Sequence, residues 1–457
     1  MRASDGSGYE GRSAASTDRP VSVLPAGEAG VRAAPGTLRA LKWSMTAIAA
    51  AVLAACGGGD ESTDARGGVA STTQTMSYAK AAIDSIAAPL APLIGAAAKC
   101  DVTQHKVVYD TIDPRGGAAR ASAGLAIPSG CPGPYPVLVY THGTTVTKSF
   151  SMSSPANAEA ALQVAMFAAQ GYVVVMPDYH GYGDSNVGYH PYLHAENTAA
   201  VSVDALRASR KVLADRGVAT SGKLFISGYS QGGHSAMALL RTLERDHANE
   251  FKVTASTPSS GPYALEETFV GGLTTPSQGA TVFATMTFVG YQKAYGDVYA
   301  KPEDVFRAPW VTGIESLLPG TLGFDELFTT GKLPLQLTGA GGLLTDGFVA
   351  GVQSSADFPM RRRLRENGLL NWKPAAPMTL CTGSRDPVVP AANTTAAGSY
   401  FGSRGAVVNT VDVETVPSFA PAIAAQLAND PYLLTYHGTV VPPLCAAVAK
   451  GTFDALK

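Results

Sequence analysis

The chain alternates short apolar runs with longer stretches in which apolar residues recur at helical spacing. The apolar runs begin at Val137, Val173 and Leu224, and helical stretches at Ala158–Gln170 and Ala199–Leu213 separate them. Strands that alternate with helices in this way are typical of an α/β fold, in which crossover helices join neighbouring strands. The predicted architecture is therefore a mostly parallel central sheet with helices on both faces.

A long segment interrupts this alternation between a strand at Val253–Thr257 and a late strand at Met378–Gly383. The segment 265–372 is rich in Gly, Phe and Leu and lacks strand alternation, so we predict an inserted helical cap. The sequence around the cap, 76–264 and 373–457, is interpreted as the two parts of one catalytic core.

The cap is expected to overhang the catalytic edge of the sheet, because both of its ends start from that edge. Most of its large apolar residues are expected to form its own core. With Tyr179 and Tyr182 outside the cap, they also suggest a groove for acyl chains. The cap residues considered are Phe269, Phe283, Met286, Phe288, Phe324 and Phe328.

Composition favours one large globular catalytic domain. The chain is 46% hydrophobic and its formal net charge is −2, which allows a sizeable core. No basic patch is present, so the sequence gives no indication of a nucleic-acid partner.

A pentapeptide of the form G-x-S-x-G, Gly228-Tyr229-Ser230-Gln231-Gly232, lies between a strand and a helix. The strand Lys223–Ser227 precedes it and the helical pattern Gly233–Glu244 follows it, as in a nucleophile elbow. The glycines leave room for strand and helix around a serine held in a strained conformation. We predict that Ser230 is a hydrolase nucleophile, and the alternative is a glycine-rich turn with a structural serine.

The partners of this serine follow from chain order. A serine hydroxyl needs a base, and the base needs an acid to orient it. In enzymes with this elbow, the acid and then the histidine follow the serine along the chain. Asp386 follows the late strand, and His437 is the only histidine after Asp386, on a loop before a final helix. The predicted triad is Ser230, Asp386 and His437, and the alternative for His437 is a surface residue.

An oxyanion hole is expected from two backbone N–H groups. One belongs to Gln231, the residue after the nucleophile. The other is assigned to Thr144, in the loop that follows the apolar strand Val137–Tyr140. Two donors aimed at the developing oxyanion would each contribute about 3 kcal/mol. His142, in the same loop, is interpreted as a packing and loop-ordering residue.

Several motifs carry a resemblance to a known family. The runs Gly171–Ser185, His190–Ala195, Gly228–His234 and Glu366–Pro374 resemble bacterial α/β-hydrolases related to secretory lipases, and the resemblance covers about 76–457. It implies the α/β-hydrolase fold and esterase or lipase activity, with the triad Ser230, Asp386 and His437. It does not fix the acyl chain.

The amino-terminal part indicates export. Leu53-Ala54-Ala55-Cys56-Gly57 matches a lipobox, and Met45–Ala55 is an apolar run preceded by Arg39 and Lys42. The run is shorter than the roughly 20 residues of a membrane-spanning helix. We predict a lipoprotein signal peptide at 39–55, lipid attachment at Cys56 and a flexible tether at 56–75. The alternative is an ordinary secretory signal cleaved elsewhere. The polar extension 1–38 is interpreted as spurious or disordered.

The remaining cysteines fit an oxidising compartment. Cys100 precedes a strand at Val102–Thr111 and Cys131 follows one at Ala119–Ile127, so a hairpin would bring them together and favour a Cys100–Cys131 disulfide. Cys381–Cys445 would be the second. Four cysteines allow three pairings. No Cys/His spacing typical of zinc is present.

The sequence therefore predicts an exported serine ester hydrolase, either an envelope lipoprotein or a secreted protein. It would cleave uncharged small-molecule or lipid esters through an acyl-enzyme, without a metal or cofactor. One alternative is a serine peptidase of the same fold, although no propeller or other peptide-gating module is evident in the sequence. The other is a non-catalytic binding protein, a class in which a triad member is typically lost.

Overall fold

The computed structural model describes residues 66–430, 433 and 435–457 of the chain. The predicted extension 1–38, the signal peptide 39–55 and Cys56 lie outside the described residues. None of the helices in the described part of the chain is both long and apolar enough to cross a bilayer.

The described chain is built on a nine-stranded sheet with the order β1-β2-β3-β5-β4-β6-β7-β8-β9. The pairs β1–β2, β2–β3 and β3–β5 are antiparallel. The other neighbouring pairs in this order, from β5–β4 to β8–β9, are parallel. This arrangement confirms the predicted α/β-hydrolase fold with a mostly parallel sheet. The strands are β1 (Val69–Tyr78), β2 (Asp101–Ile112), β3 (Ala118–Ser129), β4 (Tyr135–Thr141), β5 (Val173–Pro177), β6 (Thr220–Tyr229), β7 (Val253–Ser259), β8 (Met378–Thr382) and β9 (Val408–Asp412).

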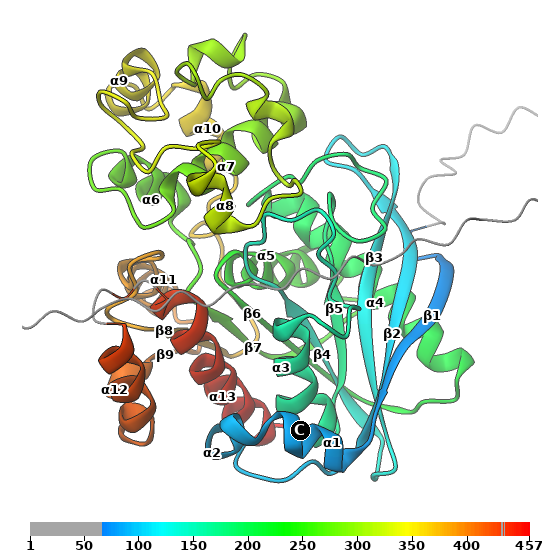
Figure 1. Cartoon of the computed structure of the whole chain (residues 1–457). Helices are drawn as coiled ribbons and strands as arrows, with labels where there is room; N and C mark the ends of the chain where they lie inside the picture. Colours follow the sequence, from blue (N-terminus) through cyan, green and yellow to red (C-terminus); the bar gives the residue numbers. More distant parts are fainter. Residues whose placement is uncertain (1–65, 431–432, 434) are drawn as a thin grey trace, which may run out of the picture. The chain divides into compact units, whose positions relative to one another are not determined.

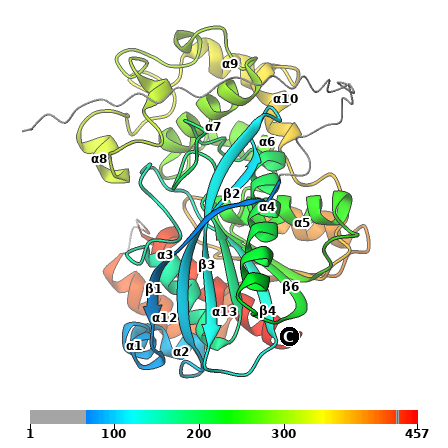
Figure 2. The ribbon, with the colours of Figure 1, turned by 90° about the vertical axis from the view of Figure 1, so that its right-hand side faces the viewer.

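Helices cover both faces of the sheet (Figures 1 and 2). On β4, Val137 and Val139 pack against the helices of one face, whereas Leu138 and Tyr140 pack against those of the other. Successive side chains of a strand point to opposite faces, so a strand covered on both faces is apolar throughout. One face carries α4 (Ala195–Asp215), α5 (Gln231–Asp246) and α11 (Ala392–Gly402); the other carries α1 (Lys80–Ile86), α2 (Ala91–Ile94), α3 (Ala158–Met166) and α13 (Val441–Asp454), with α12 (Ala420–Asn429) beside α13.

The chain between β7 and β8 forms a group of helices beyond the carboxyl ends of the central strands (Figure 1). We call it the cap. It has an apolar core of its own, in which Phe288, Leu327 and Phe348 are buried. Glu266 on the first cap helix pairs with Arg361 and Arg365 on the last. The cap helices are α6 (Leu265–Gly272), α7 (Ala280–Tyr295), α8 (Phe324–Thr329), α9 (Asp346–Ser354) and α10 (Pro359–Glu366).

The sheet begins earlier in the chain than the sequence predicts. Strand β1 occupies Val69–Tyr78, so the interpretation of 56–75 as a flexible tether is wrong for its last part. The Ser/Thr-rich composition that suggested a linker belongs to an edge strand, which pairs with β2 through its backbone and leaves most side chains exposed. Without a buried face, the strand has no apolar alternation that could reveal it.

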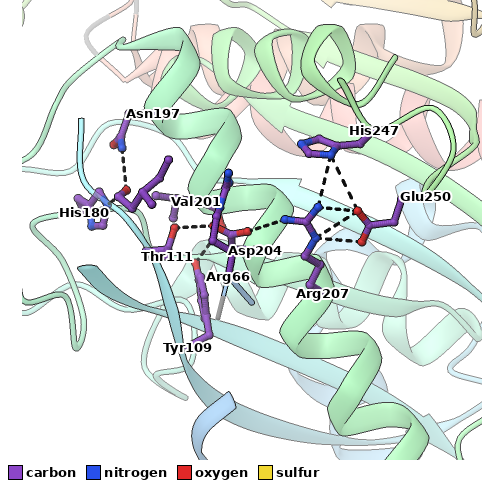
Figure 3. Close-up of polar contacts among 11 residues, drawn as sticks. Arg66, Tyr109, Thr111, His180, Asn197, Val201, Asp204, Arg207, His247 and Glu250 are labelled. Atoms are coloured by element: carbon purple, nitrogen blue, oxygen red, sulfur yellow. Dashed lines mark hydrogen bonds and ion pairs between the residues drawn. The ribbon is translucent and has the colours of Figure 1, made fainter. Parts of the chain in front are cut away.

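The buried carboxylate of Asp204 on α4 pairs with Arg66, in the segment just before β1. Asp204 has a fully buried side chain and accepts hydrogen bonds from Arg66 Nε (3.0 Å), Thr111 Oγ1 (2.8 Å) and Arg207 Nη1 (3.0 Å). Figure 3 shows Asp204 between the two arginines, with Glu250 on the far side of Arg207. A buried charge is tolerated when it is paired and hydrogen-bonded in this way. The contacts tie α4 to β2 and to the segment that leads into β1.

Both predicted disulfides are present. Cys100–Cys131 closes the open end of the β2–β3 hairpin, with 5.0 Å between the two Cα atoms. Cys381–Cys445 joins β8 to α13, with 5.7 Å between the Cα atoms. The second disulfide links the strand that precedes Asp386 to the helix that follows His437.

Candidate active site

The turn between β6 and α5 places Ser230 in an unusual backbone conformation. Its φ and ψ are 59° and −121°, a region that non-glycine residues rarely occupy. The Ser230 N–H donates to Ser259 O at 2.9 Å and holds the turn in place. A Cβ on Gly228 would overlap Thr141 and Gly232, and a Cβ on Gly232 would overlap the Thr141 carbonyl. The two glycines of the motif are therefore required by close packing, which leaves the serine hydroxyl at the end of the sheet.

The structure brings the three predicted triad residues into one hydrogen-bonded chain. His437 Nε2 lies 2.8 Å from Ser230 Oγ, and His437 Nδ1 lies 2.6 Å from Asp386 Oδ2. The Asp386 side chain is fully buried and that of His437 is 13% exposed. A proton on Nδ1 satisfies the carboxylate and leaves the Nε2 lone pair to accept from the serine hydroxyl.

The backbone after β8 orients the Asp386 carboxylate. The N–H groups of Val388 and Val389 donate to its Oδ1 at 2.9 and 3.0 Å. Oδ2 is thereby left for His437. The Asp386 N–H donates to Gly383 O at 3.1 Å and closes the turn that follows the strand.

His437 lies in a π-helical turn, Tyr436–Val440, that continues directly into α13. The sequence predicts a loop here, because a single widened turn has no apolar period of its own. Such turns are frequent at functional sites. Tyr436 donates to Glu414 Oε1 at 2.5 Å, and Glu414 also accepts from the backbone and side chain of Arg385. The segments that carry His437 and Asp386 are thus joined by polar contacts.

The Glu414 carboxylate stays ionised in this position. Burial alone would raise its pKa, but the hydrogen bonds from Tyr436 and Arg385 outweigh burial and lower it. An ionised carboxylate is the stronger acceptor for both partners.

The residues of the two predicted oxyanion donors, Gln231 and Thr144, each line a cavity that Ser230 also lines. Within the described residues, neither the Gln231 N–H nor the Thr144 N–H has a hydrogen-bond acceptor. Gly143, next to Thr144, donates its N–H to Glu159 Oε1 at 3.0 Å. Burial lowers the pKa of His142 to about 4, so its imidazole is neutral near pH 7 and contacts the carbonyl oxygens of Gly143 and Asp178.

Two buried tyrosines donate hydrogen bonds to the loop that follows β4 and carries His142 and Thr144. Tyr179 donates to His142 O at 3.1 Å, and Tyr182 donates to Thr145 O at 2.6 Å. Both side chains are 1% exposed and line neither of the cavities at the serine. The expectation that they form part of an acyl groove is therefore wrong. Their hydroxyl groups reach backbone carbonyls, and this holds the rings in the interior.

Two cavities meet at Ser230. A narrow one of about 80 Å³ runs under the cap, and an open one of about 820 Å³ lies on the side of His437. Ser230, Phe283 and Val388 line both. The narrow cavity is also lined by apolar residues, among them Leu193, Phe269, Leu273, Ala284, Phe288 and Leu337. The open cavity is also lined by Thr144, Glu159, Phe324, Asp325, His437 and Pro442.

Several contacts at the site involve residues that the sequence did not single out. Tyr192 lines the narrow cavity, and its hydroxyl lies 2.7 Å from Thr144 Oγ1. Tyr229 lines the open cavity and contacts His437 through its hydroxyl.

The cap aromatics Phe269, Phe283 and Phe288 line the narrow cavity and also pack in the cap. The interpretation of most cap aromatics as simple core residues is therefore incomplete. Cavity lining depends on tertiary placement and has no sequence signal.

No metal site accompanies these residues in the described part of the chain, where no three His, Cys, Asp or Glu side chains gather as metal ligands would. The sheet topology, the elbow between β6 and α5, and the placement of the hydrogen-bonded residues beyond the strand ends together define an α/β-hydrolase.

Comparison with solved structures of known proteins shows to which family of α/β-hydrolases the chain belongs. The crystal structure of the rice cell wall degrading esterase LipA from Xanthomonas oryzae is 34% identical, covers 86% of this chain and 100% of its own, and has a TM-score of 0.76. The chain belongs to the same family of esterase-type α/β-hydrolases as LipA. A putative hydrolase from Legionella pneumophila is 24% identical, with 85% and 98% of the two chains covered and a TM-score of 0.74, and shares the fold. So does Candida antarctica lipase A, at 16% identity, 80% and 83% coverage and a TM-score of 0.57.

Comparison with family models adds one match. Residues 158–259 match the prolyl oligopeptidase family. This range runs from α3 to β7 and includes the elbow but not Asp386, His437 or the cap. No curated protein is significantly similar to the chain.

Proposed function

We propose that the protein hydrolyses carboxylic esters through an acyl-enzyme on Ser230. The observation that supports this most directly is the hydrogen-bonded chain from Ser230 Oγ through His437 to Asp386. His437 Nε2 takes the hydroxyl proton as Ser230 attacks the ester carbonyl and returns it to the departing alcohol. A water then attacks the acyl-enzyme by the same route.

The negative charge of the tetrahedral intermediate would be received by the Gln231 and Thr144 N–H groups. Both N–H groups lack an acceptor among the described residues, and both residues line a cavity at Ser230. Donors that are already oriented need no reorganisation as the charge develops. Asp386 keeps the proton on Nδ1 and balances the imidazolium that forms.

The two cavities suggest how an ester would lie. The narrow apolar cavity under the cap suits an uncharged acyl chain of short to medium length, and the open cavity beside His437 suits the alcohol, which leaves from that side. Phe283 stands where both cavities meet, so its ring limits the space for the acyl chain.

Phe283→Ala is expected to shift the preferred substrate towards longer acyl chains. Deleting the ring would join the narrow cavity to the open one. Each methylene added to the acyl chain then contributes at most about 1–3 kcal/mol to binding of the transition state. We expect the ratio of kcat/KM for p-nitrophenyl octanoate over the butanoate to rise about tenfold. Phe328→Ala is the matched control, because Phe328 packs in the cap and lines neither cavity. Equal chain-length profiles in both variants would contradict a role of Phe283 in selectivity.

A serine peptidase is the second candidate, because residues 158–259 match the prolyl oligopeptidase family. That match is confined to part of the core. In the region that the structure describes, the chain forms one sheet with a helical cap and no propeller. Parallel assays on p-nitrophenyl esters and aminoacyl p-nitroanilides separate the two activities, and a marked preference for the amides would favour the peptidase.

The non-catalytic alternative is tested independently of the substrate. A fluorophosphonate probe should label the protein at Ser230, identified by peptide mass. Absence of labelling in the folded protein would favour a binding module and would contradict the proposed activity.

Export and lipid attachment belong to the same proposal. The two disulfides are typical of proteins that fold in an oxidising compartment, and the lipobox at Cys56 would supply the anchor. The first contact that the structure describes after Cys56 is the hydrogen bond from Arg66 to Asp204. Cys56→Ser is expected to release the protein from the membrane fraction or to block its processing. An unmodified mature terminus at another residue, found by mass spectrometry of the wild type, would refute the anchor.

A further inference from the structure

Tyr229, the residue before the nucleophile, makes two contacts with His437 through one hydroxyl group. The hydroxyl donates to the His437 carbonyl oxygen at 2.6 Å, and its oxygen lies 3.2 Å from His437 Nδ1. The tyrosine ring lies against the imidazole, with 5.0 Å between ring centroids and an interplanar angle of 38°. Tyr229 is buried, with 6% of the residue exposed, so water competes little for these contacts.

The direction of these hydrogen bonds follows from the number of protons available. A phenol has one proton, and the shorter contact assigns it to the His437 carbonyl. The oxygen therefore presents a lone pair to Nδ1, which must carry the proton. The same N–H donates to Asp386 Oδ2 at 2.6 Å. Tyr229 and Asp386 thus both favour the tautomer in which Nε2 is free to accept the Ser230 proton.

The Tyr229 hydroxyl keeps its proton near neutral pH. Burial, and then the charge of Asp386, raise the pKa of Tyr229 well above its ordinary value. The Tyr229 hydroxyl is therefore available as a donor to the His437 carbonyl near neutral pH.

We propose that Tyr229 is a positioning residue for the base, fixing both the backbone and the ring of His437 relative to Ser230. The inference rests on the proposed function of the triad. Tyr229 and Ser230 are neighbours in the strained turn, so a single piece of backbone sets the nucleophile and, through the phenol, the base. The position is the first variable residue of G-x-S-x-G, which the motif itself leaves open to any side chain.

Tyr229→Phe tests this assignment because it removes one oxygen and keeps the ring. The ring would stay packed against Cys381, Val413 and Tyr436, so the fold should be retained. Loss of a hydrogen bond to a group that becomes charged during the reaction should reduce kcat for p-nitrophenyl butanoate about 10-fold, with KM within about twofold. The rate of labelling by a fluorophosphonate should fall by a similar factor, because that reaction uses the same serine and base.

Tyr172→Phe is the matched control. The Tyr172 ring is fully buried and its hydroxyl donates to Asp454 at 2.8 Å, on the helix α13 but away from the triad. Both variants should lower Tm by a similar small amount, but only Tyr229→Phe should lower kcat. An unchanged kcat in Tyr229→Phe, or a fall in rate that only matches a loss of folded protein, would overturn the assignment.

The same measurements separate this inference from the proposed function. If the wild type is labelled at Ser230 and Tyr229→Phe is labelled equally fast, the triad stands and the positioning role falls. If the folded wild type is neither labelled nor active on esters, the proposed function fails and the positioning role fails with it.

Discussion

Ser230→Ala is expected to lower kcat/KM for p-nitrophenyl esters by about 10⁴-fold or more, with a Tm close to that of the wild type. The substitution deletes one hydroxyl, which is hydrogen-bonded to His437 Nε2, and adds no volume. The remaining rate would come from the oxyanion donors and the cavities alone. Steady-state kinetics with protein purified away from other hydrolases measures the effect, and intact mass after fluorophosphonate treatment should show no adduct.

Substitution of His437, alone and together with Ser230, provides the control for this result. His437→Ala should be nearly as damaging, and Ser230→Ala with His437→Ala should be little worse than either alone, because the residues act as a unit. Effects that multiply in the double variant would show that the two side chains work separately. Retention of more than a few per cent of activity by Ser230→Ala would assign the nucleophile to another residue.

The parts of the fold and site that depend on local sequence could be predicted. The elbow is encoded within a few residues, because Gly228 and Gly232 are needed for the approach of Thr141 and its neighbours. The apolar runs of β4, β5 and β6 reflect burial on both faces of the sheet. The Cys100–Cys131 pair follows from hairpin geometry, since the hairpin itself fixes which ends meet.

The parts that depend on distant contacts could not be predicted. Tyr229 meets His437 across about half the chain, and Glu159 at the start of α3 accepts hydrogen bonds from the Tyr140 hydroxyl and the Gly143 N–H. Strand β1 is an exposed edge that pairs through its backbone, so its side chains show no pattern. The sequence suggests a groove surface for Tyr179 and Tyr182, yet both are buried, and their hydroxyl groups donate to backbone carbonyls of the loop that follows β4. In each case the decisive partner is remote in sequence.

Asp386→Asn is expected to lower kcat by about 10³- to 10⁴-fold while leaving the fold intact. The reason lies in the two N–H groups of Val388 and Val389, which donate to Oδ1 at 2.9 and 3.0 Å. These donors require an acceptor, so the oxygen of the introduced amide would stay with them. The amide nitrogen would then take the place of Oδ2 and face His437 Nδ1 as a donor. Nδ1 would have to become the acceptor, and the imidazole proton would move to Nε2.

In that tautomer the Nε2–H points at Ser230 Oγ, which lies 2.8 Å away in the wild type, and the imidazole can no longer take the serine proton. The lone pair of the Tyr229 hydroxyl would also face a nitrogen without a proton, so the two contacts that hold the ring would lose their complementarity. Asp412→Asn is the matched control: Asp412 Oδ1 accepts from the backbone of Ser384 and Glu414 in the neighbouring turn and does not touch the imidazole. The same chemical change there should lower kcat far less. Kinetics of both variants, with the introduced amide verified by peptide mass against deamidation, decides between the two sites; more than about a tenth of wild-type kcat in Asp386→Asn would show that the carboxylate does not set the tautomer of His437.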